Sequence, residues 1–387
     1  MTNNTLNKRL VSIDILRGLV IVIMLIDHTR ERFFLHHQVA DPMDIDTTDP
    51  ALFFTRLLAH FCAPIFVFLT GLSAFLYQNP INKPARNVQS FLLKRGAFLV
   101  LLEVTLVNFS WFAAYNTLYL QVMWAIGVSM IALAALSYLP RLWLLGLGLA
   151  IVFGHNALSP VTFLANETGY TLWTILHDRG YLISDGLVKV KASYPVLPWI
   201  GVIILGYVCG PLFTQSVAAA VRQKALVVGG IACLVTLCIL RSLNLYGESL
   251  DFAVQNTLVL SIMSFLNYTK YPPSLPFLLF TLGIGALMLA YFENAQSKVS
   301  NVLRTFGSVP LFFYIVHLYV LLVTYFVLLH LFGPTPGLAG VAGFELGFSH
   351  LVWIWLTAAV LTGLLYKPCK MFSDFKHSST TWWVKYL

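Results

Sequence analysis

The stretch "SIDILRGLVIVIMLIDH", residues 12–28, combines an apolar run of membrane-helix length with four ionisable side chains. Asp14 and Arg17 lie near its start, and Asp27 and His28 end it. An ionisable side chain at the centre of a bilayer costs about 2.5–3.5 kcal/mol on insertion scales, so such residues mark functional sites by default. The stretch therefore predicts a membrane helix with a function beyond anchoring.

The composition of the whole chain predicts an integral membrane protein. Of its 387 residues, 58% are hydrophobic and 10% are charged, and the mean hydropathy is +0.78. The apolar blocks of about 17–25 residues suit helices that cross the hydrocarbon core, whereas barrel strands alternate over about 10 residues. We therefore predict an all-α, polytopic bundle that forms one transmembrane domain over residues 1–387. The net charge of +8 indicates no nucleic-acid partner, because a bilayer sorts charge by side.

Charge distribution predicts the orientation of about ten spans. The spans are expected at 11–28, 52–77, 91–112, 117–138, 142–158, 195–213, 225–243, 274–292, 310–332 and 348–366. With a cytoplasmic N-terminus, the inner side holds fifteen of the 24 Lys and Arg residues, and the outer side holds eleven of the 16 acids. The positive-inside rule thus predicts that both termini are cytoplasmic. The long loops 29–51, 159–194 and 244–273 then lie outside, where long loops tend to carry function.

No metal site or disulfide is predicted. The five cysteines form no CxxC pair, and the aspartates of the loop 41–49 do not have the spacing of an EF-hand. No A-x-A cleavage site follows the first apolar run, so we expect this run to remain as the first span.

The ionisable residues of the first span share one helix face. Eleven steps from Arg17 to His28 give about 1,100°, which is roughly 20° past three full turns, and Asp14 lies about 40° from His28. The rise from Arg17 to His28 is about 16 Å, roughly half the hydrocarbon core. Asp27 points elsewhere, so it either caps or pairs locally or is a secondary catalytic candidate beside His28. The alternative is structural, with Arg17 reaching the interface and pairing with Asp14.

Several motifs resemble one family of membrane enzymes. The first span, with its D-x-x-R-G, and "FFTRLLAHFCAPIFVFLTG" are similar to the opening of the heparan-alpha-glucosaminide N-acetyltransferase-like family of bacterial membrane proteins. "LQVMWAIG" (120–127), "YPVLPWIGV" (194–202), "SFLNYTKYPPSL" (264–275) and "PLFFYIVHL" (310–318) extend the resemblance over nearly the whole chain. The spacing of Arg17 and His28 also resembles that of the wider transmembrane acyltransferase superfamily.

The resemblance implies transfer of an acyl group, expected to be acetyl, from cytoplasmic acetyl-CoA to a carbohydrate on the far side. Arg17 and Asp14, with Lys94 and Arg95 in the inner loop, are the expected donor-binding residues, since Arg presents a fork of donors to phosphate. His28 is the leading general base or acyl carrier. In the enzyme that names the family, the proposed catalytic histidine falls near His36 and His37 here, so His37 stays a candidate.

For further polar residues, the sequence allows both a structural and a catalytic interpretation. His60 follows Arg56 by four residues, on one helix face, and the two form either a structural pair or part of the site. His37 lies in an acidic loop and is either solvated or catalytic. His317 lies deep in an apolar run and needs a partner in the bundle. Glu103 is also expected within the membrane, and its sequence neighbours do not indicate its role.

Six residues are predicted to bind the acceptor, and Arg56 is one of them. Lys270 and Asn267 precede a span start, and Lys270 is suited to an acceptor carboxylate. Gln121, Trp124 and Trp199 are suited to stacking and hydrogen bonding with a sugar, although interfacial aromatic belts are the commoner reason for such residues.

We therefore predict an acetyl-CoA-dependent acetyltransferase of the bacterial inner (plasma) membrane that acts on a carbohydrate or glycoconjugate. The main alternative is a proton-coupled transporter that uses Asp14, Arg17 and His28 as a relay, and a non-catalytic assembly protein is the second. The partners are acyl-CoA, the acceptor and the lipid bilayer, and a homodimer is compatible with the sequence.

Overall fold

The computed structural model describes residues 11–34, 36, 37, 39–336, 345–379, 381 and 384. Its helices are α1 (Val11–Phe33), α2 (Pro50–Leu58), α3 (Cys62–Gln78), α4 (Val88–Leu102), α5 (Asn108–Phe112), α6 (Val122–Leu136), α7 (Arg141–Gly154), α8 (Tyr170–Leu176), α9 (Leu197–Cys209), α10 (Ala219–Ser242), α11 (Leu258–Leu266), α12 (Leu275–Phe292), α13 (Lys298–Ser308), α14 (Pro310–Phe332) and α15 (Leu351–Ser378). Its strands are β1 (Thr117–Leu120), β2 (Gly180–Ile183) and β3 (Lys189–Ala192). The predicted helical character is confirmed.

Long apolar helices identify an integral membrane protein. In the described part of the chain, six stretches are long and apolar enough to cross a bilayer. They are Pro50–Gln78, Arg141–Leu158, Ala219–Ser242, Leu275–Phe292, Pro310–Phe332 and Leu351–Ser378. The helix α6 and the stretch Leu197–Phe213 are apolar but shorter. The count of ten spans and the cytoplasmic termini remain predictions, and residues 1–10 and 385–387 lie outside the described residues.

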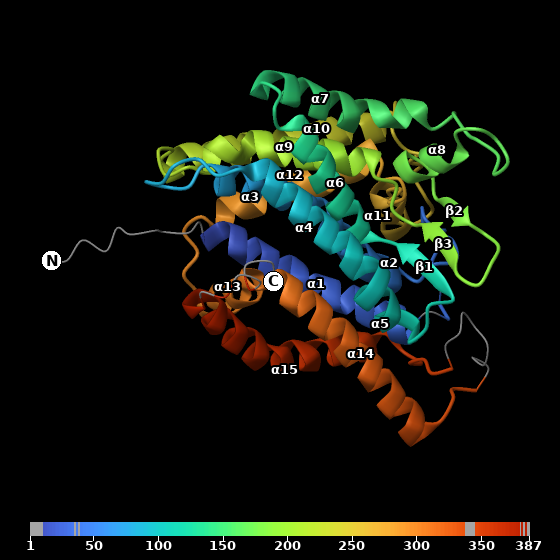
Figure 1. Cartoon of the computed structure of the whole chain (residues 1–387). Coiled ribbons are helices and arrows are strands. Elements are labelled where there is room, and N and C mark those ends of the chain that lie inside the picture. Colours follow the sequence, from blue (N-terminus) through green and yellow to red (C-terminus); the bar gives the residue numbers. More distant parts are fainter. Residues whose placement is uncertain are drawn as a thin grey trace.

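The prediction of an all-α chain is wrong at one end of the bundle. There, β1 pairs in parallel with β3, and β2 pairs with β3 in antiparallel fashion. Residues 117–120, expected to start a span, form β1, and α6 begins only at Val122. An apolar run with β-branched and aromatic residues suits a strand as well as a helix, which explains the error. The sheet and α8 lie together at what we call the sheet end, and α13 lies at the opposite end, the α13 end (Figure 1).

Several helices also extend beyond, or lie outside, the predicted spans. The helix α1 continues to Phe33, and α15 passes through Pro368 to Ser378. The helices α8, α11 and α13 occupy segments expected as loops. Hydropathy marks where an apolar run ends, whereas the backbone hydrogen bonds of a helix continue into polar sequence.

Glu103 explains how α6 can begin inside the bundle. Its chain segment, Glu103–Val107, is a π-helical turn between α4 and α5. The fully buried carboxylate of Glu103 accepts hydrogen bonds from the backbone N–H groups of Met123 at 2.9 Å and Trp124 at 3.1 Å. The first N–H groups of a helix have no acceptor within the helix. Glu103 supplies this acceptor for two of them and so stabilises the start of α6, which hydrophobic side chains could not do.

The helix α1 is held at both of its ends. Near its start, a Cβ at Gly18 would overlap the backbone of Leu303 in α13, and one at Gly307 would overlap the backbone of Asp14. Glycines therefore let α1 and α13 approach closely. At its end, the guanidinium of Arg32 donates to the carbonyls of Ser110 at 2.6 Å and Trp111 at 2.5 Å, which closes the C-terminal turn of α5.

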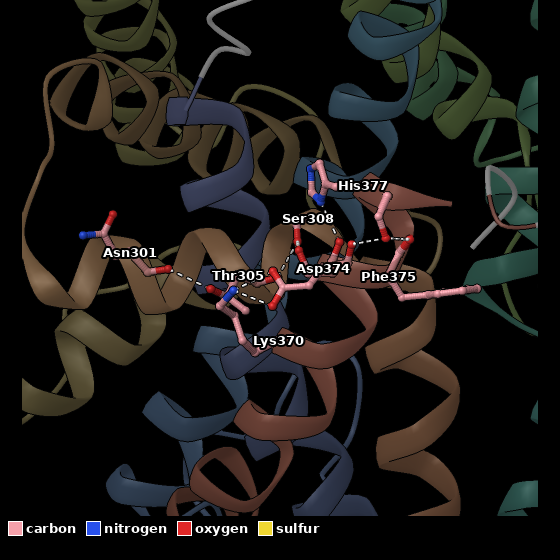
Figure 2. A network of polar contacts seen from close by, with 9 residues as sticks. Asn301, Thr305, Ser308, Lys370, Asp374, Phe375 and His377 are labelled. Carbon is pink, nitrogen blue, oxygen red and sulfur yellow. Dashed lines mark hydrogen bonds and ion pairs between the residues drawn. The ribbon is translucent and has the colours of Figure 1, made fainter. Parts of the chain in front are cut away.

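Polar contacts join α13 to α15, as Figure 2 shows. The hydroxyl oxygens of Ser308 and Ser373 lie 2.8 Å apart, and Lys376 Nζ donates to the Ser308 carbonyl at 3.3 Å. Lys370 and Asp374, one turn apart on α15, form an exposed ion pair at 2.7 Å. The C-terminal extension of α15 is thereby fixed against the helix that packs on α1.

Candidate active site

Two cavities meet at His28. The sheet-end chamber has a volume of about 800 Å³ and lies among the loops and strands of the sheet end. The apolar cavity, of about 130 Å³, extends between α1, α3, α4 and α6 as far as Thr70 and Arg95. Six residues line both cavities: Asp27, His28, Val122, Tyr194, Lys270 and Tyr314. A molecule in either cavity can therefore contact His28.

A hydrogen bond to a second histidine determines which ring nitrogen of neutral His28 carries the hydrogen. Nδ1 of His317 lies 2.8 Å from the Phe313 carbonyl, which only accepts, so this nitrogen carries a hydrogen. When His317 is neutral, its Nε2 is an acceptor, and it lies 2.7 Å from Nδ1 of His28. His28 then donates from Nδ1, which leaves its Nε2 unprotonated. The half-buried imidazole is thus oriented as a proton acceptor.

Trp111 and Tyr314 hold the ring of His28 from two further sides. The ring centroid of His28 lies 5.3 Å from that of Trp111 and 6.0 Å from that of Tyr314, both edge-on. Tyr314 stands one helical turn before His317 on α14, so one helix supplies both neighbours. The three rings restrict the orientation of the His28 imidazole.

Asp27 also faces the cavities. The helical spacing predicts that it points away from His28, yet both side chains line both cavities, because two adjacent residues of α1 flank the junction. The predicted local pairing is present: Asp27 Oδ1 accepts from Arg30 at 2.9 Å. Arg56 and Lys270 also interact electrostatically with this carboxylate.

Lys270 lies on a loop that acidic side chains hold in place. The carboxylate of Asp41 accepts from the backbone N–H groups of Lys270 at 3.1 Å and Tyr271 at 2.9 Å. Glu248 accepts from the N–H of Thr269 at 3.0 Å and from the hydroxyl of Ser274. Burial raises the pKa of Glu248 to about 7. These contacts place the Lys270 ammonium at the cavity junction.

Several of the predicted site residues come together. Asp27, His28, Arg56, Gln121 and Lys270 line the sheet-end chamber, and Arg95 lines the apolar cavity. These residues come from α1, α2, α4, the link between β1 and α6, and the loop before α12.

Other predicted residues have structural surroundings. Asn267 bonds both the N–H and the carbonyl of Met43, at 2.9 Å and 2.6 Å, and so links two loops. Trp199 is fully buried, and His60 packs against Phe277 with ring centroids 5.0 Å apart. Trp124 follows the start of α6. These four predicted residues line neither cavity.

The remaining predicted residues also lie outside both cavities. The ring of His37 stacks on that of Phe34, with the ring centroids 4.6 Å apart, and Lys94 is exposed. Arg17 pairs with Asp14 at 3.4 Å and donates to the Leu69 carbonyl at 3.3 Å, which joins α1 to α3.

Several polar residues of the chamber were not predicted, among them Tyr194, Arg179, Lys191 and Tyr314. Tyr194 and Tyr314 stand inside the quoted motifs "YPVLPWIGV" and "PLFFYIVHL", so the sequence carried a signal for them. Arg179 and Lys191 belong to the loop that forms β2 and β3, and only the sheet brings them to the chamber. Within the described residues, no three His, Cys, Asp or Glu side chains form a metal-binding group.

Comparison with known proteins names the family. A family model described as heparan-alpha-glucosaminide N-acetyltransferase, catalytic, matches residues 9–246, more than half of the chain. A comparison with curated proteins gives no significant match. The matched range contains His28, Arg56 and Arg95, and the family uses acetyl-CoA as its acetyl donor. The resemblance seen in the sequence is confirmed: the chain is a membrane protein of the heparan-alpha-glucosaminide N-acetyltransferase catalytic family.

Proposed function

We propose that the protein transfers the acetyl group of cytoplasmic acetyl-CoA to a hydroxyl or amine of a carbohydrate on the other side of the membrane. The observation that carries the proposal is the position of His28, where the sheet-end chamber and the apolar cavity meet. Donor and acceptor can thus approach one imidazole from two directions, which is the positioning that group transfer requires.

The apolar cavity suits the thioester arm of the donor. Its lining is mainly apolar, from Met24, Phe66, Leu99 and Ile126, with Arg95 as a cation on α4. An apolar passage with Arg95 on α4, besides Lys270 at the junction with the chamber, fits an uncharged pantetheine arm that is attached to phosphates. Arg95 is the first candidate for donor binding, and Arg17 and Lys94 are the other cations proposed for that side.

The proposed chemistry uses Nε2 of His28 as a general base. It accepts the proton of the acceptor hydroxyl or amine while that oxygen or nitrogen forms a bond to the acetyl carbonyl carbon. The bond from carbon to sulfur breaks, and the CoA thiolate leaves with the electron pair. His317 orients His28 and stabilises the imidazolium that forms, and Lys270 lies beside the reacting groups.

The proposed orientation places the α13 end in the cytoplasm and the sheet end outside. This assignment agrees with the charge distribution, because Lys298, Arg304, Lys370 and Lys376 lie on α13 and the end of α15. The bacterial inner membrane and an extracytoplasmic acceptor are part of the same proposal.

Proton-coupled transport is the second candidate function, because cavities reach His28 from two directions. One experiment separates the two functions. The purified protein is incubated with acetyl-labelled acetyl-CoA and a panel of sugars. Label should appear on a sugar with the wild type, and far more slowly with His28→Ala. Uptake of an unmodified sugar into proteoliposomes, without acetyl transfer, would favour transport.

A further inference from the structure

We propose that the acceptor carries an oxyanion, a carboxylate or a phosphate, that binds between Arg56 and Lys270 in the sheet-end chamber. The inference rests on the proposed function for calling the ligand an acceptor. The anion site itself follows from the charges of the chamber.

The chamber lining has an excess of positive charge. It contains five basic side chains, Arg30, Arg56, Arg179, Lys191 and Lys270, and three acidic ones, Asp27, Glu31 and Asp41. The acids already have partners. Asp27 and Glu31 bind Arg30 at 2.9 Å and 3.3 Å, and Asp41 accepts backbone N–H groups of the Lys270 loop.

Arg56 and Lys270 are buried and, among the described residues, form no direct ion pair with a carboxylate. Their exposed fractions are 7% and 4%. The Nη1 atom of Arg56 is buried and has no hydrogen-bond partner among the described residues. In the same part of the chain, no carboxylate oxygen lies within 4.0 Å of the Arg56 guanidinium or the Lys270 ammonium. Asp27 interacts with both at longer range, and Glu31 and Asp41 act on Arg56 in the same way, but each of these carboxylates is bound to another partner.

Arg56 is balanced by carboxylates only at longer range and keeps an unsatisfied N–H donor at Nη1, so an anion that binds both cations directly would complete the site. A guanidinium presents a fork of N–H donors that matches two oxygens of a carboxylate or phosphate, and an ammonium adds a third contact. The two cations come from α2 and from the loop before α12, so an anion between them would also join these elements.

Two more cations flank the same chamber. The guanidinium of Arg179 lies 4.5 Å from the ring centroid of Tyr271, and Lys191 Nζ lies 5.1 Å from that of Tyr181. A chamber with an excess of positive charge attracts anionic ligands. These residues therefore increase the capture of an anionic acceptor.

The position of the cations sets the position of the anion on the acceptor. Lys270 and His28 line both cavities, whereas Arg56 lines only the sheet-end chamber. An anion held by both cations thus lies on the acceptor side of His28, close to the group that is acetylated. A sugar acid or a sugar phosphate has this arrangement of hydroxyl or amine and oxyanion.

The test compares matched acceptors in acetyl-transfer assays. Galactose is paired with galacturonic acid, and glucosamine with glucosamine 6-phosphate, so the two arms separate carboxylate from phosphate. We expect kcat/KM for at least one anionic member to exceed that for its neutral partner by about 10- to 100-fold, the range for charge-assisted hydrogen bonds. Arg56→Gln and Lys270→Gln should reduce this preference at least about tenfold. Lys189→Gln, an exposed neighbour outside the chamber, should retain it.

Thermal unfolding of the wild-type protein with the same four sugars, at constant ionic strength, tests the anion site without any transfer. A rise in Tm with an anionic sugar, and none with its neutral partner, supports the anion site. If in addition no sugar is acetylated, the proposed function is rejected and the anion site stands. Because this measurement uses only the wild-type protein, it tests the anion site even if the Arg56 variant does not fold. Equal Tm and equal kcat/KM for anionic and neutral members of both pairs would overturn the inference.

Discussion

The Nδ1 atom of His28 lies 2.7 Å from the Nε2 atom of His317, and the carbonyl of Phe313 decides the direction of the hydrogen bond between them. Two histidines that are 289 residues apart in the sequence thus form one unit. This unit gives His28 an unprotonated nitrogen at the junction of the two cavities.

His317→Phe should lower kcat by about 10- to 100-fold, part of the share of a general base, because His28 loses the acceptor that orients it. The KM for acetyl-CoA should stay unchanged, since His317 lines neither cavity. His317→Gln, which keeps an acceptor, should restore part of kcat. His60→Phe, buried outside both cavities, serves as the control. Loss of kcat in both His317 variants, with both folded and no difference between them, would contradict a positioning role.

Arg95→Gln should weaken acetyl-CoA binding by about tenfold, because Arg95 lines the apolar cavity from α4, away from the junction at which Lys270 lies. The exposed neighbour Lys94 should matter less when changed to Gln. Titration of the purified variants with acetyl-CoA measures both affinities. If Arg17→Ala reduces affinity more than Arg95→Gln, the donor lies along α1 rather than in this cavity.

Gly18→Ala should destabilise the protein by about 1–3 kcal/mol, because the new Cβ overlaps the backbone of Leu303 and forces α1 away from α13. Gly229→Ala on α10 is the matched control, since a Cβ there meets no atom within 4 Å. Thermal unfolding in detergent compares the two. Equal Tm values would contradict the close approach of α1 and α13.

Glu248 should make stability depend on pH. Burial raises its pKa from 4.5 to about 7. The folded protein therefore binds this proton more tightly than the unfolded chain, and the resulting stabilisation, at most about 3 kcal/mol, is full below about pH 4.5 and lost by about pH 7. Thermal unfolding between about pH 5 and pH 8 should show a fall in Tm that is smaller in Glu248→Gln. Asp185→Asn, on an exposed residue, should keep the wild-type profile.

The sequence predicted those features of the fold and the site that depend on the residues of a single helix or segment. The apolar runs predicted the membrane helices, and the 3.6-residue period placed His28 on a stripe that leads to the cavity junction. Arg56 stood out because it shares a helix face with His60, and Lys270 because it directly precedes the start of a span. In each case the deciding information lies within one segment of the chain.

The missed features depend on contacts between distant segments. The link from His28 to His317, the approach of Arg179 to Tyr271 and the parallel pairing of β1 with β3 join residues that no local pattern relates. The start of α6 depends on Glu103, whose apolar neighbours suggested an uninterrupted span. Arg17 shows the converse, because it shares a helix with His28 but its contacts are with Asp14, as in the structural alternative, and with α3.

The central claim is that His28 is the base of the transfer, and His28→Ala tests it most directly. Its acetyl-transfer turnover should fall by about 10²–10⁴, the usual share of a general base, while the Kd for acetyl-CoA and the Tm stay close to those of the wild type. His37→Ala and His60→Ala, measured side by side, should retain most turnover, since neither side chain lines a cavity. Near-normal turnover in folded His28→Ala, together with an inactive His37 or His60 variant, would contradict the account.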